Sequence, residues 1–492
     1  MSVPIARDAA AGAPVAAYPT VRTPVRIGRL SLPHRVVMGS MHLNLENASP
    51  ESLAAFYTER ARGGAALIIT GGAAVSRVGA GNAGYTLIRE VEHAQRWRVV
   101  VDAVHREGAR VALQLFHAGR YAFPDAFGLT PVAPSAVYSR FSRAEPQPLT
   151  EEGIQETIAD FAAAARVAVD LGFDAVEVMA SEGYLINQFA SPVTNLRDDE
   201  WGGDAQRRRA FPVAVTRAVR EAAGDRAVLV RISGDDLVPG SSTPDEVDAL
   251  AAELVRAGAD AIDVGIGWHE SRTPTVQSMV PHAAWTGISA RIRGSIARAG
   301  AAVPVIASNR INSLEQAEAV LAAGHADLVS MARPFLADPH IVALSFAGRS
   351  EWVNPCIACN EACIDRSFGL ESVSCTVNPR AGRELDFPLG PVVPVGPLAS
   401  AVPAVPAVPV SKSGDTGVEP DNPVGPASHL ISMRSDAADA AGAAGAAGVG
   451  AVGVGVVRAD VSRCSAQAHR VSGARRPDRQ RGEATVAALA ED

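Results

Sequence analysis

Short apolar runs alternate with longer amphipathic stretches from about residue 25 to residue 349. The apolar runs have the length of buried strands, and the stretches between them have apolar side chains at helical spacing. Glycine, proline and N-cap residues mark many of the boundaries, such as Ser49 before residues 50–63. We expect strands at residues 35–40, 65–72, 110–117, 175–179, 227–233, 261–267, 304–309 and 328–333, and helices that include residues 50–63, 91–107, 150–171, 204–223, 244–257, 313–323 and 334–346.

Eight apolar strands, each followed by a helix, fit a parallel sheet that closes on itself better than an open sheet. The pattern therefore predicts an α/β fold, a (β/α)8 TIM barrel over residues 25–349. Residues 1–24 are rich in alanine and proline, and Asp8 interrupts any apolar run. We expect a disordered lead-in there and no signal peptide, which agrees with a cytoplasmic protein.

Composition narrows the functional classes. The net charge of −8 gives no basic face for nucleic acid, because binding to phosphate backbones needs clustered positive charge. Lys412 is the one lysine in the chain, and it lies in a low-complexity region. Schiff-base chemistry in the barrel is therefore excluded.

Four of the five cysteines fall within one short segment, as C-x2-C-x3-C-x11-C. Four thiolates so close together form a ligand set for an iron-sulfur cluster or for zinc, and the spacing alone leaves both open. Disulfides are disfavoured because no secretory signal precedes the segment. The four residues are Cys356, Cys359, Cys363 and Cys375.

Polar residues follow the expected strands, where the chemistry of such barrels takes place. Three arginines, Arg231, Arg310 and Arg333, lie at the ends of the fifth, seventh and eighth strands. Their convergence with an amide favours a phosphorylated cofactor. The other polar or small residues at strand ends are Ser40, Met41, His42, Gly71, Gly72, Gln114, His117, Ser181, Glu182, Tyr184, Trp268, His269 and Asn309.

Several of these segments resemble the 2,4-dienoyl-CoA reductases of the old yellow enzyme (NADH:flavin oxidoreductase) family, over residues 25–385. The matching segments are residues 35–42, 113–120, 181–187, 200–204, 265–270 and 329–335, together with the cysteine segment. The resemblance implies a barrel that binds FMN noncovalently, since no cysteine precedes Cys356. It implies that Ser40, Met41, His42 and Gly72 line the flavin, Gln114 bonds its pyrimidine edge, Arg231 lies near N1 and the C2 carbonyl, and Arg310, Ala332 and Arg333 hold the phosphate.

The resemblance also implies a catalytic pair, Tyr184 and His269. A phenol can protonate the carbon next to the one that receives hydride, and an imidazole can support it. Classical old yellow enzymes hold the substrate carbonyl with residues five and two positions before the tyrosine. Here these are Met179 and Glu182, which cannot donate to a carbonyl oxygen. The segment 189–195 lacks the arginine of the enteric dienoyl-CoA reductases, which puts acyl-CoA in doubt as the substrate.

Placed after such a barrel, the cysteine set is expected to bind a 4Fe-4S cluster within residues 350–388. Residues 389–492 are expected to be a low-complexity tail without a convincing dinucleotide-binding domain, so FAD is unlikely in this chain. Gly448–Gly453 matches G-x-G-x-x-G, but alanine and glycine precede it in place of a strand. The uncharged run at residues 440–457 is too weakly apolar to predict a membrane span.

The sequence thus predicts an FMN- and iron-sulfur-dependent oxidoreductase that reduces an activated conjugated C=C bond, as in a 2,4-dienoyl-CoA, enoyl or enone substrate. NAD(P)H is the expected source of electrons, directly or through a separate electron-transfer protein. Two alternatives stay open, an amine dehydrogenase with the same cofactors and a non-catalytic zinc-stabilised barrel. No oligomeric state is indicated.

Overall fold

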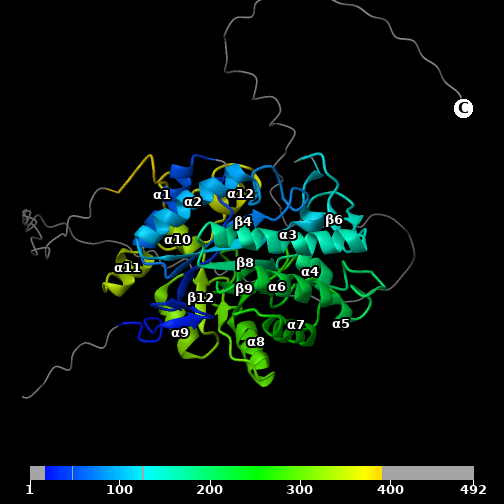
Figure 1. Cartoon of the computed structure of the whole chain (residues 1–492). Coiled ribbons are helices and arrows are strands. Elements are labelled where there is room, and N and C mark those ends of the chain that lie inside the picture. The colour runs from blue at the N-terminus through cyan, green and yellow to red at the C-terminus, as the bar shows by residue number, and fades with distance from the viewer. Residues whose placement is uncertain (1–16, 47, 125–126, 390–492) are drawn as a thin grey trace, which may run out of the picture. The chain divides into compact units, whose positions relative to one another are not determined.

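A closed barrel of eight parallel strands forms the centre of the computed structural model, which describes residues 17–46, 48–124 and 127–389 (Figure 1). Residues 1–16 of the expected lead-in and residues 390–492 of the expected tail lie outside the described residues. The predicted (β/α)8 fold is confirmed. Around the barrel the strands are β3 (Val36–Met38), β4 (Leu67–Ala74), β5 (Arg110–Phe116), β8 (Ala175–Ala180), β9 (Ala227–Ser233), β10 (Ala261–Gly265), β11 (Val305–Ala307) and β12 (Leu328–Met331), and β12 pairs with β3.

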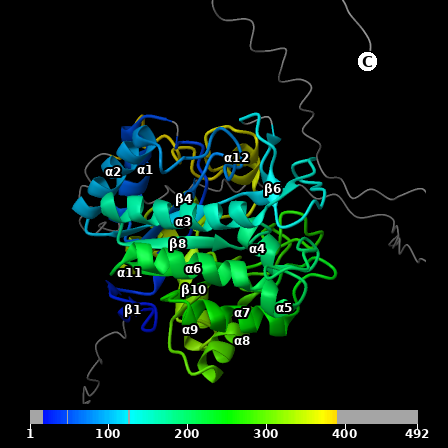
Figure 2. The ribbon, with the colours of Figure 1, turned by 45° about the vertical axis from the view of Figure 1, so that its right-hand side comes forward.

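Helices surround the strands, as two views 45° apart show (Figure 2). Side-chain caps start several of them: Ser49, Thr150 and Ser313 each accept a backbone N–H, and Thr243 with Glu246 forms a capping box. The main helices are α1 (Pro50–Arg62), α2 (Val91–Arg106), α3 (Glu151–Asp170), α6 (Ala210–Ala223), α7 (Pro244–Arg256), α8 (Thr286–Arg298), α9 (Leu314–Ala322) and α11 (Ile341–Phe346).

Two of the expected helices are each broken in two. Residues 204–223 divide into α5 (Ala205–Arg208) and α6, because Pro212 has no N–H to donate to the Arg208 carbonyl. Residues 334–346 divide into α10 (Arg333–Ala337) and α11, since Asp338 precedes Pro339 and takes an extended conformation. Proline thus sets both breaks.

An antiparallel hairpin that the sequence reading did not predict closes the N-terminal end of the barrel. It consists of β1 (Val25–Ile27) and β2 (Leu30–Leu32). Ile27 and Leu32 are fully buried against the apolar side chains inside the barrel, such as Leu67 and Leu229. The site must therefore open at the other end, where the strands run out.

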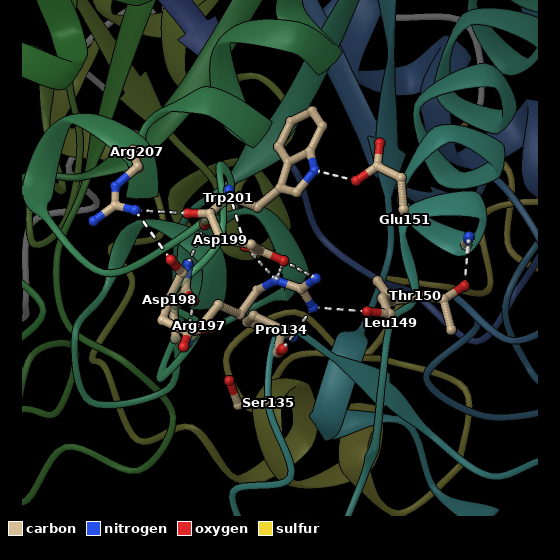
Figure 3. A network of polar contacts seen from close by, with 12 residues as sticks. Pro134, Ser135, Leu149, Thr150, Glu151, Arg197, Asp198, Asp199, Trp201 and Arg207 are labelled. Carbon is tan, nitrogen blue, oxygen red and sulfur yellow. Dashed lines mark hydrogen bonds and ion pairs between the residues drawn. The ribbon is translucent and has the colours of Figure 1, made fainter.

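Arg197 joins the loop after the fourth barrel strand to its surroundings (Figure 3). Its guanidinium donates to the carbonyls of Pro134, at 3.2 Å, and Leu149, at 2.7 Å, and pairs with Asp199. The indole of Trp201 donates to Glu151 at 2.5 Å, which ties the loop to α3. The matching segment at residues 200–204 is thus part of a structural joint.

The cysteine segment is attached to the barrel by hydrogen bonds and two ion pairs. The Val373 N–H donates to the Leu43 carbonyl at 2.9 Å. Arg380 forms a two-pronged ion pair with Glu59 of α1, at 2.8 and 3.0 Å. Arg60 of α1 and Glu384 form a second pair, which is almost wholly buried. In the part of the chain that the structure describes, no helix has the length and apolarity to cross a bilayer.

Candidate active site

A cavity of about 450 Å³ opens at the C-terminal end of the barrel. All eleven residues predicted to bind the cofactor or to act in catalysis line it, although their roles stay predictions. Three other residues at strand ends do not: Gly71 and Ser181 are buried, and His117 is fully buried with a pKa lowered to about 3 by burial. The lining includes Ser40, Met41, His42, Gly72, Gln114, Arg231, Arg310, Ala332 and Arg333, the pair Tyr184 and His269, and residues of the loops, Tyr85, Glu182 and Phe368.

Arg231 forms part of the floor of this cavity. Its guanidinium lies 2.9 Å from a carboxylate oxygen of Asp263 on β10 and 3.0 Å from one of Glu182. Burial disfavours its charge, but these two carboxylates outweigh burial and raise the pKa of Arg231. Neither ion pair could be predicted from the sequence. Together they balance the positive charge of Arg231.

Arg310 and Arg333 lie at the side of the cavity formed by the last two strands. Neither forms an ion pair with a carboxylate among the described residues, and one nitrogen of Arg310, Nη1, is buried without an acceptor. Burial and the nearby Arg333 lower the pKa of Arg310. Asn309 and Arg310 both have positive φ, of 65° and 61°, a strain that proteins retain mainly at functional sites. Two unpaired cations here fit a phosphate group.

Ser40 and His42, which follow β3, and Gln114 of β5 add further polar groups to the lining of the cavity. Ser40 donates to Oε1 of Gln114 at 3.0 Å, and the Gln114 amide nitrogen is buried without an acceptor. A Cβ on Gly72 would lie 3.1 Å from Cβ of Phe116 and 3.3 Å from Oε1 of Gln114. Both ring nitrogens of His42 are buried without hydrogen bonds, and its ring stacks on Tyr85 at 3.9 Å. The cavity thus has buried hydrogen-bond donors as well as the two arginines, Arg310 and Arg333. A flavin nucleotide, which has a polar ring system and a phosphate, fits this combination.

Tyr184 and His269 form the expected pair. The Tyr184 hydroxyl lies 2.7 Å from Nε2 of His269. Glu182 and Gly183, with φ of 63° and 85°, make the turn that brings Tyr184 to the start of α4 (Leu185–Ala190). A Cβ at Gly183 would lie 2.5 Å from the Tyr121 hydroxyl, so the turn requires glycine.

Burial sets the protonation of this pair. It raises the pKa of Tyr184 well above 10 and lowers the pKa of His269, so at neutral pH both are uncharged. The imidazole tautomer decides which of the two groups donates in their hydrogen bond, and the phenol donates when Nε2 carries no proton. A carboxylate oxygen of Glu182 lies 4.0 Å from the same nitrogen and opposes the effect of burial. The pair holds one transferable proton over the cavity.

Replacing Glu182 with glutamine should lower the pKa of His269 further, because it removes the negative charge that favours the imidazolium. NMR titration of the histidine ring protons, assigned with His269→Gln, would measure the shift. Histidines outside the cavity serve as the internal reference for the measurement. A His269 pKa that stays the same or rises would contradict this electrostatic role of Glu182.

Aromatic rings enclose His269 on several sides. Phe141 stacks on it with 5.3 Å between centroids, and Phe368, from the segment that follows Cys363, meets it edge-on at 5.5 Å. Tyr121 lies at 5.8 Å. These rings come from loops without a periodic pattern, so no signal in the sequence pointed to them.

The four cysteines line one small cavity beside Arg333. All four are free thiols and partly buried. Burial raises the pKa of Cys363 to about 11 and also raises that of Cys375. Among the described residues, no three His, Cys, Asp or Glu side chains are grouped so that they could hold a metal ion. The cysteines are therefore gathered, while the expected metal cluster stays a prediction.

Comparison with known proteins relates the whole barrel to flavin enzymes. The family model described as NADH:flavin oxidoreductase / NADH oxidase family matches residues 21–349. A metal reductase of Desulforamulus reducens is 43% identical over 75% of this chain and 55% of its own length. An NADH oxidase of Thermoanaerobacter brockii is 36% identical over 75% of this chain and 57% of its own.

A solved structure extends the comparison. A 2-naphthoyl-CoA reductase in complex with 2-naphthoyl-CoA superposes with a TM-score of 0.72 and 29% identity, over 75% of this chain and 58% of the other. The chain thus spans little more than half the length of these relatives.

Proposed function

Because the chain belongs to the NADH:flavin oxidoreductase / NADH oxidase family, the old yellow enzyme family of flavin-dependent oxidoreductases, we propose that it reduces an activated conjugated C=C bond. The substrate class is a 2,4-dienoyl-CoA or a related enoyl or enone compound. The observation that carries this proposal is the 2.7 Å contact between Tyr184 and His269 in the wall of the cavity. A neutral phenol in this position can donate a proton to carbon.

FMN, when bound, supplies the hydride for this reaction. The Gln114 amide nitrogen, which has no acceptor among the described residues, would orient it, and the Ser40 hydroxyl, which donates to Oε1 of Gln114, holds that amide in place. Tyr184 gives its proton to the substrate, and His269 holds the hydroxyl in place. The remaining residues of the proposed cofactor site are Met41, His42, Gly72 and Arg231 along the ring system, and Arg310, Ala332 and Arg333 at the phosphate.

Arg310→Gln should raise the Kd for FMN by about 10- to 100-fold, since a charge-assisted hydrogen bond is worth about 1.5–3 kcal/mol. Quenching of flavin fluorescence on titration into the apoprotein would measure it. Arg256→Gln, an exposed arginine at the end of α7, is the matched control and should bind FMN normally. An unchanged Kd in Arg310→Gln would show that the phosphate lies elsewhere.

We propose further that Cys356, Cys359, Cys363 and Cys375 bind a 4Fe-4S cluster. Their common cavity supports this, because four thiols that line one cavity can supply the four thiolate ligands of such a cluster. An anaerobic absorption spectrum with assays of flavin, iron, sulfide and zinc tests both cofactors together. A colourless protein with one zinc would favour the non-catalytic barrel instead.

The immediate electron donor is also part of the proposal. We favour a separate electron-transfer protein that docks near the cysteines, where Trp352 and Ile357 are about half exposed. Stopped-flow mixing of the anaerobic protein with NAD(P)H tests this preference. Rapid bleaching of the flavin without a partner would instead support direct hydride transfer from NAD(P)H. The cytoplasmic location stays a prediction.

Oxidation of amines is the second candidate. The observation that favours it is the Glu182 carboxylate, which lines the cavity among aromatic rings, an arrangement that suits a cationic substrate. Simple alkylamines would then bleach the flavin under anaerobic conditions, whereas conjugated enones would not reoxidise it.

A further inference from the structure

Glu177 is buried inside the barrel beneath the cavity. It lies on β8, its side chain is fully buried, and it is not part of the cavity lining. Neither of its carboxyl oxygens accepts a hydrogen bond of ordinary geometry from any of the described residues. A carboxylate so placed would be very costly, because a buried charge needs donors or a partner.

The neighbours of Glu177 explain how it is accommodated. Its partner in register on β5 is Gln114, and on β9 it is the apolar Leu229. Burial is the main cause that raises the pKa of Glu177, and the negative charges of Asp263 on β10 and of Glu182 add to it. The positive charge of Arg231 on β9 opposes them without reversing the direction.

The positive charge of Arg231 is already balanced by other carboxylates. Its two ion pairs are with Asp263 and Glu182, at 2.9 and 3.0 Å, and Glu177 forms none. Burial raises the pKa of Asp263 too, but the ion pair with Arg231 opposes this shift and favours the charged form. With Asp263 and Glu182 ionised, one cation and two carboxylates give the floor a net charge of about −1 at neutral pH by simple formal counting. A third carboxylate would make it about −2, directly below the cofactor cavity. Reduction of a flavin adds negative charge to the same region, so each further charge in the floor disfavours it.

We propose that Glu177 is a protonated, neutral carboxylic acid at neutral pH, and that its proton keeps a second net negative charge out of the floor beneath the flavin. Glu177 is therefore a positioning residue. Its neutral state limits the negative charge below the cavity, and its side chain does not line the cavity in which cofactor and substrate would bind. The part concerning the flavin rests on the proposed FMN site, whereas the protonation of Glu177 does not.

The first test compares the holoprotein with Glu177→Gln, which has the shape of the neutral acid. A carboxyl whose pKa is raised on folding binds more protons in the folded state, so stability falls as pH rises above the unfolded pKa. The quantity to compare is the ratio of two unfolding equilibrium constants, that of the unchanged protein divided by that of Glu177→Gln. Between pH 5 and 7 this ratio should rise about tenfold per pH unit. Glu177→Gln should thus be the more stable protein at pH 7. A ratio independent of pH, or a Glu177→Gln protein that is less stable at pH 7 or fails to fold, would overturn the proposal.

Infrared spectroscopy provides a readout that does not depend on unfolding or on activity. At pH 7 the carbonyl band of a protonated carboxylic acid should be present in the unchanged protein and absent from Glu177→Gln. Asp263→Asn is the comparison in the same layer, and it removes a carboxylate. If Glu177→Gln loses intensity from the carboxylate bands instead, Glu177 is ionised and the proposal is wrong.

The reduction potential of the bound flavin tests the electrostatic consequence. Glu177→Gln should leave it unchanged at pH 7, whereas Asp263→Asn should raise it by removing a negative charge. An equal rise in both variants would show that Glu177 carries a charge. If no flavin binds at all, the proposed function fails, while the infrared result on Glu177 still stands by itself.

Discussion

Replacing Tyr184 with phenylalanine should slow turnover by about 10²- to 10⁴-fold while leaving the flavin reducible. The variant keeps the ring, which packs edge-on against Phe116 at 4.6 Å, and removes only the hydroxyl that lies 2.7 Å from His269. Hydride delivery is then no longer accompanied by protonation of the neighbouring carbon. Steady-state rates with an enone or enoyl substrate, and separately the rate of anaerobic flavin reduction, would measure the two half-reactions.

Tyr138→Phe is the matched control, because the Tyr138 side chain is about half exposed. Its turnover should equal that of the unchanged protein. Tyr184→Phe turning over at the normal rate would refute the role of Tyr184 as proton donor. Slow flavin reduction in the same variant would instead locate the defect in cofactor binding.

Glu384→Gln should destabilise the folded protein by about 3–5 kcal/mol, since it leaves a buried arginine without its counter-charge. The Arg60 side chain is inaccessible, and it stacks on Phe56 with 3.6 Å from Cζ to the ring centroid. It also donates to the carbonyls of Phe56 and Phe335, which hold it in place once the charge of Glu384 is gone. Chemical unfolding of the holoprotein would give the difference in free energy.

The exposed pair Arg29–Asp225 supplies the control. Both side chains are about three-quarters exposed, so Asp225→Asn should have no measurable effect on unfolding. Equal stability of Glu384→Gln and the unchanged protein would mean that the segment after the cysteines contributes little to the fold.

The barrel could be predicted because its strands are buried on both sides and mostly apolar, with only single polar residues such as Gln114, Arg231 and Asp263 within them. All eight strands lie within the expected ranges or extend one or two residues beyond them, as at Ala74. The hairpin at residues 25–32 was missed, since two three-residue strands carry too short a pattern to recognise. Pro212 and Pro339 mark the two helix breaks in the sequence. Pro212 lacks the N–H that a continuous helix needs, and Pro339 disfavours a helical conformation of the residue before it.

The site was predictable where it depends on strand ends, which a parallel barrel must bring to one face. Gln114, Arg231 and Arg310 come from three different strands and line one cavity. The pairing of these side chains could not be predicted from the sequence. The strand pattern indicates a free cation at Arg231. In the structure Asp263 and Glu182 neutralise it, and nothing in the sequence marks Asp263 as its partner.

Phe368 joins the cysteine segment to the wall of the cavity. It stands five positions after Cys363, and its ring meets both Phe141 and His269. Ser367 also donates to the carbonyl of His42 at 3.2 Å, which joins the same segment to the proposed cofactor loop. A change in the length of this segment would therefore shift Phe368 in the cavity wall as well as the thiols beside it. Under the proposed function, a change of substrate and a change of electron donor would thus affect the same short stretch of chain.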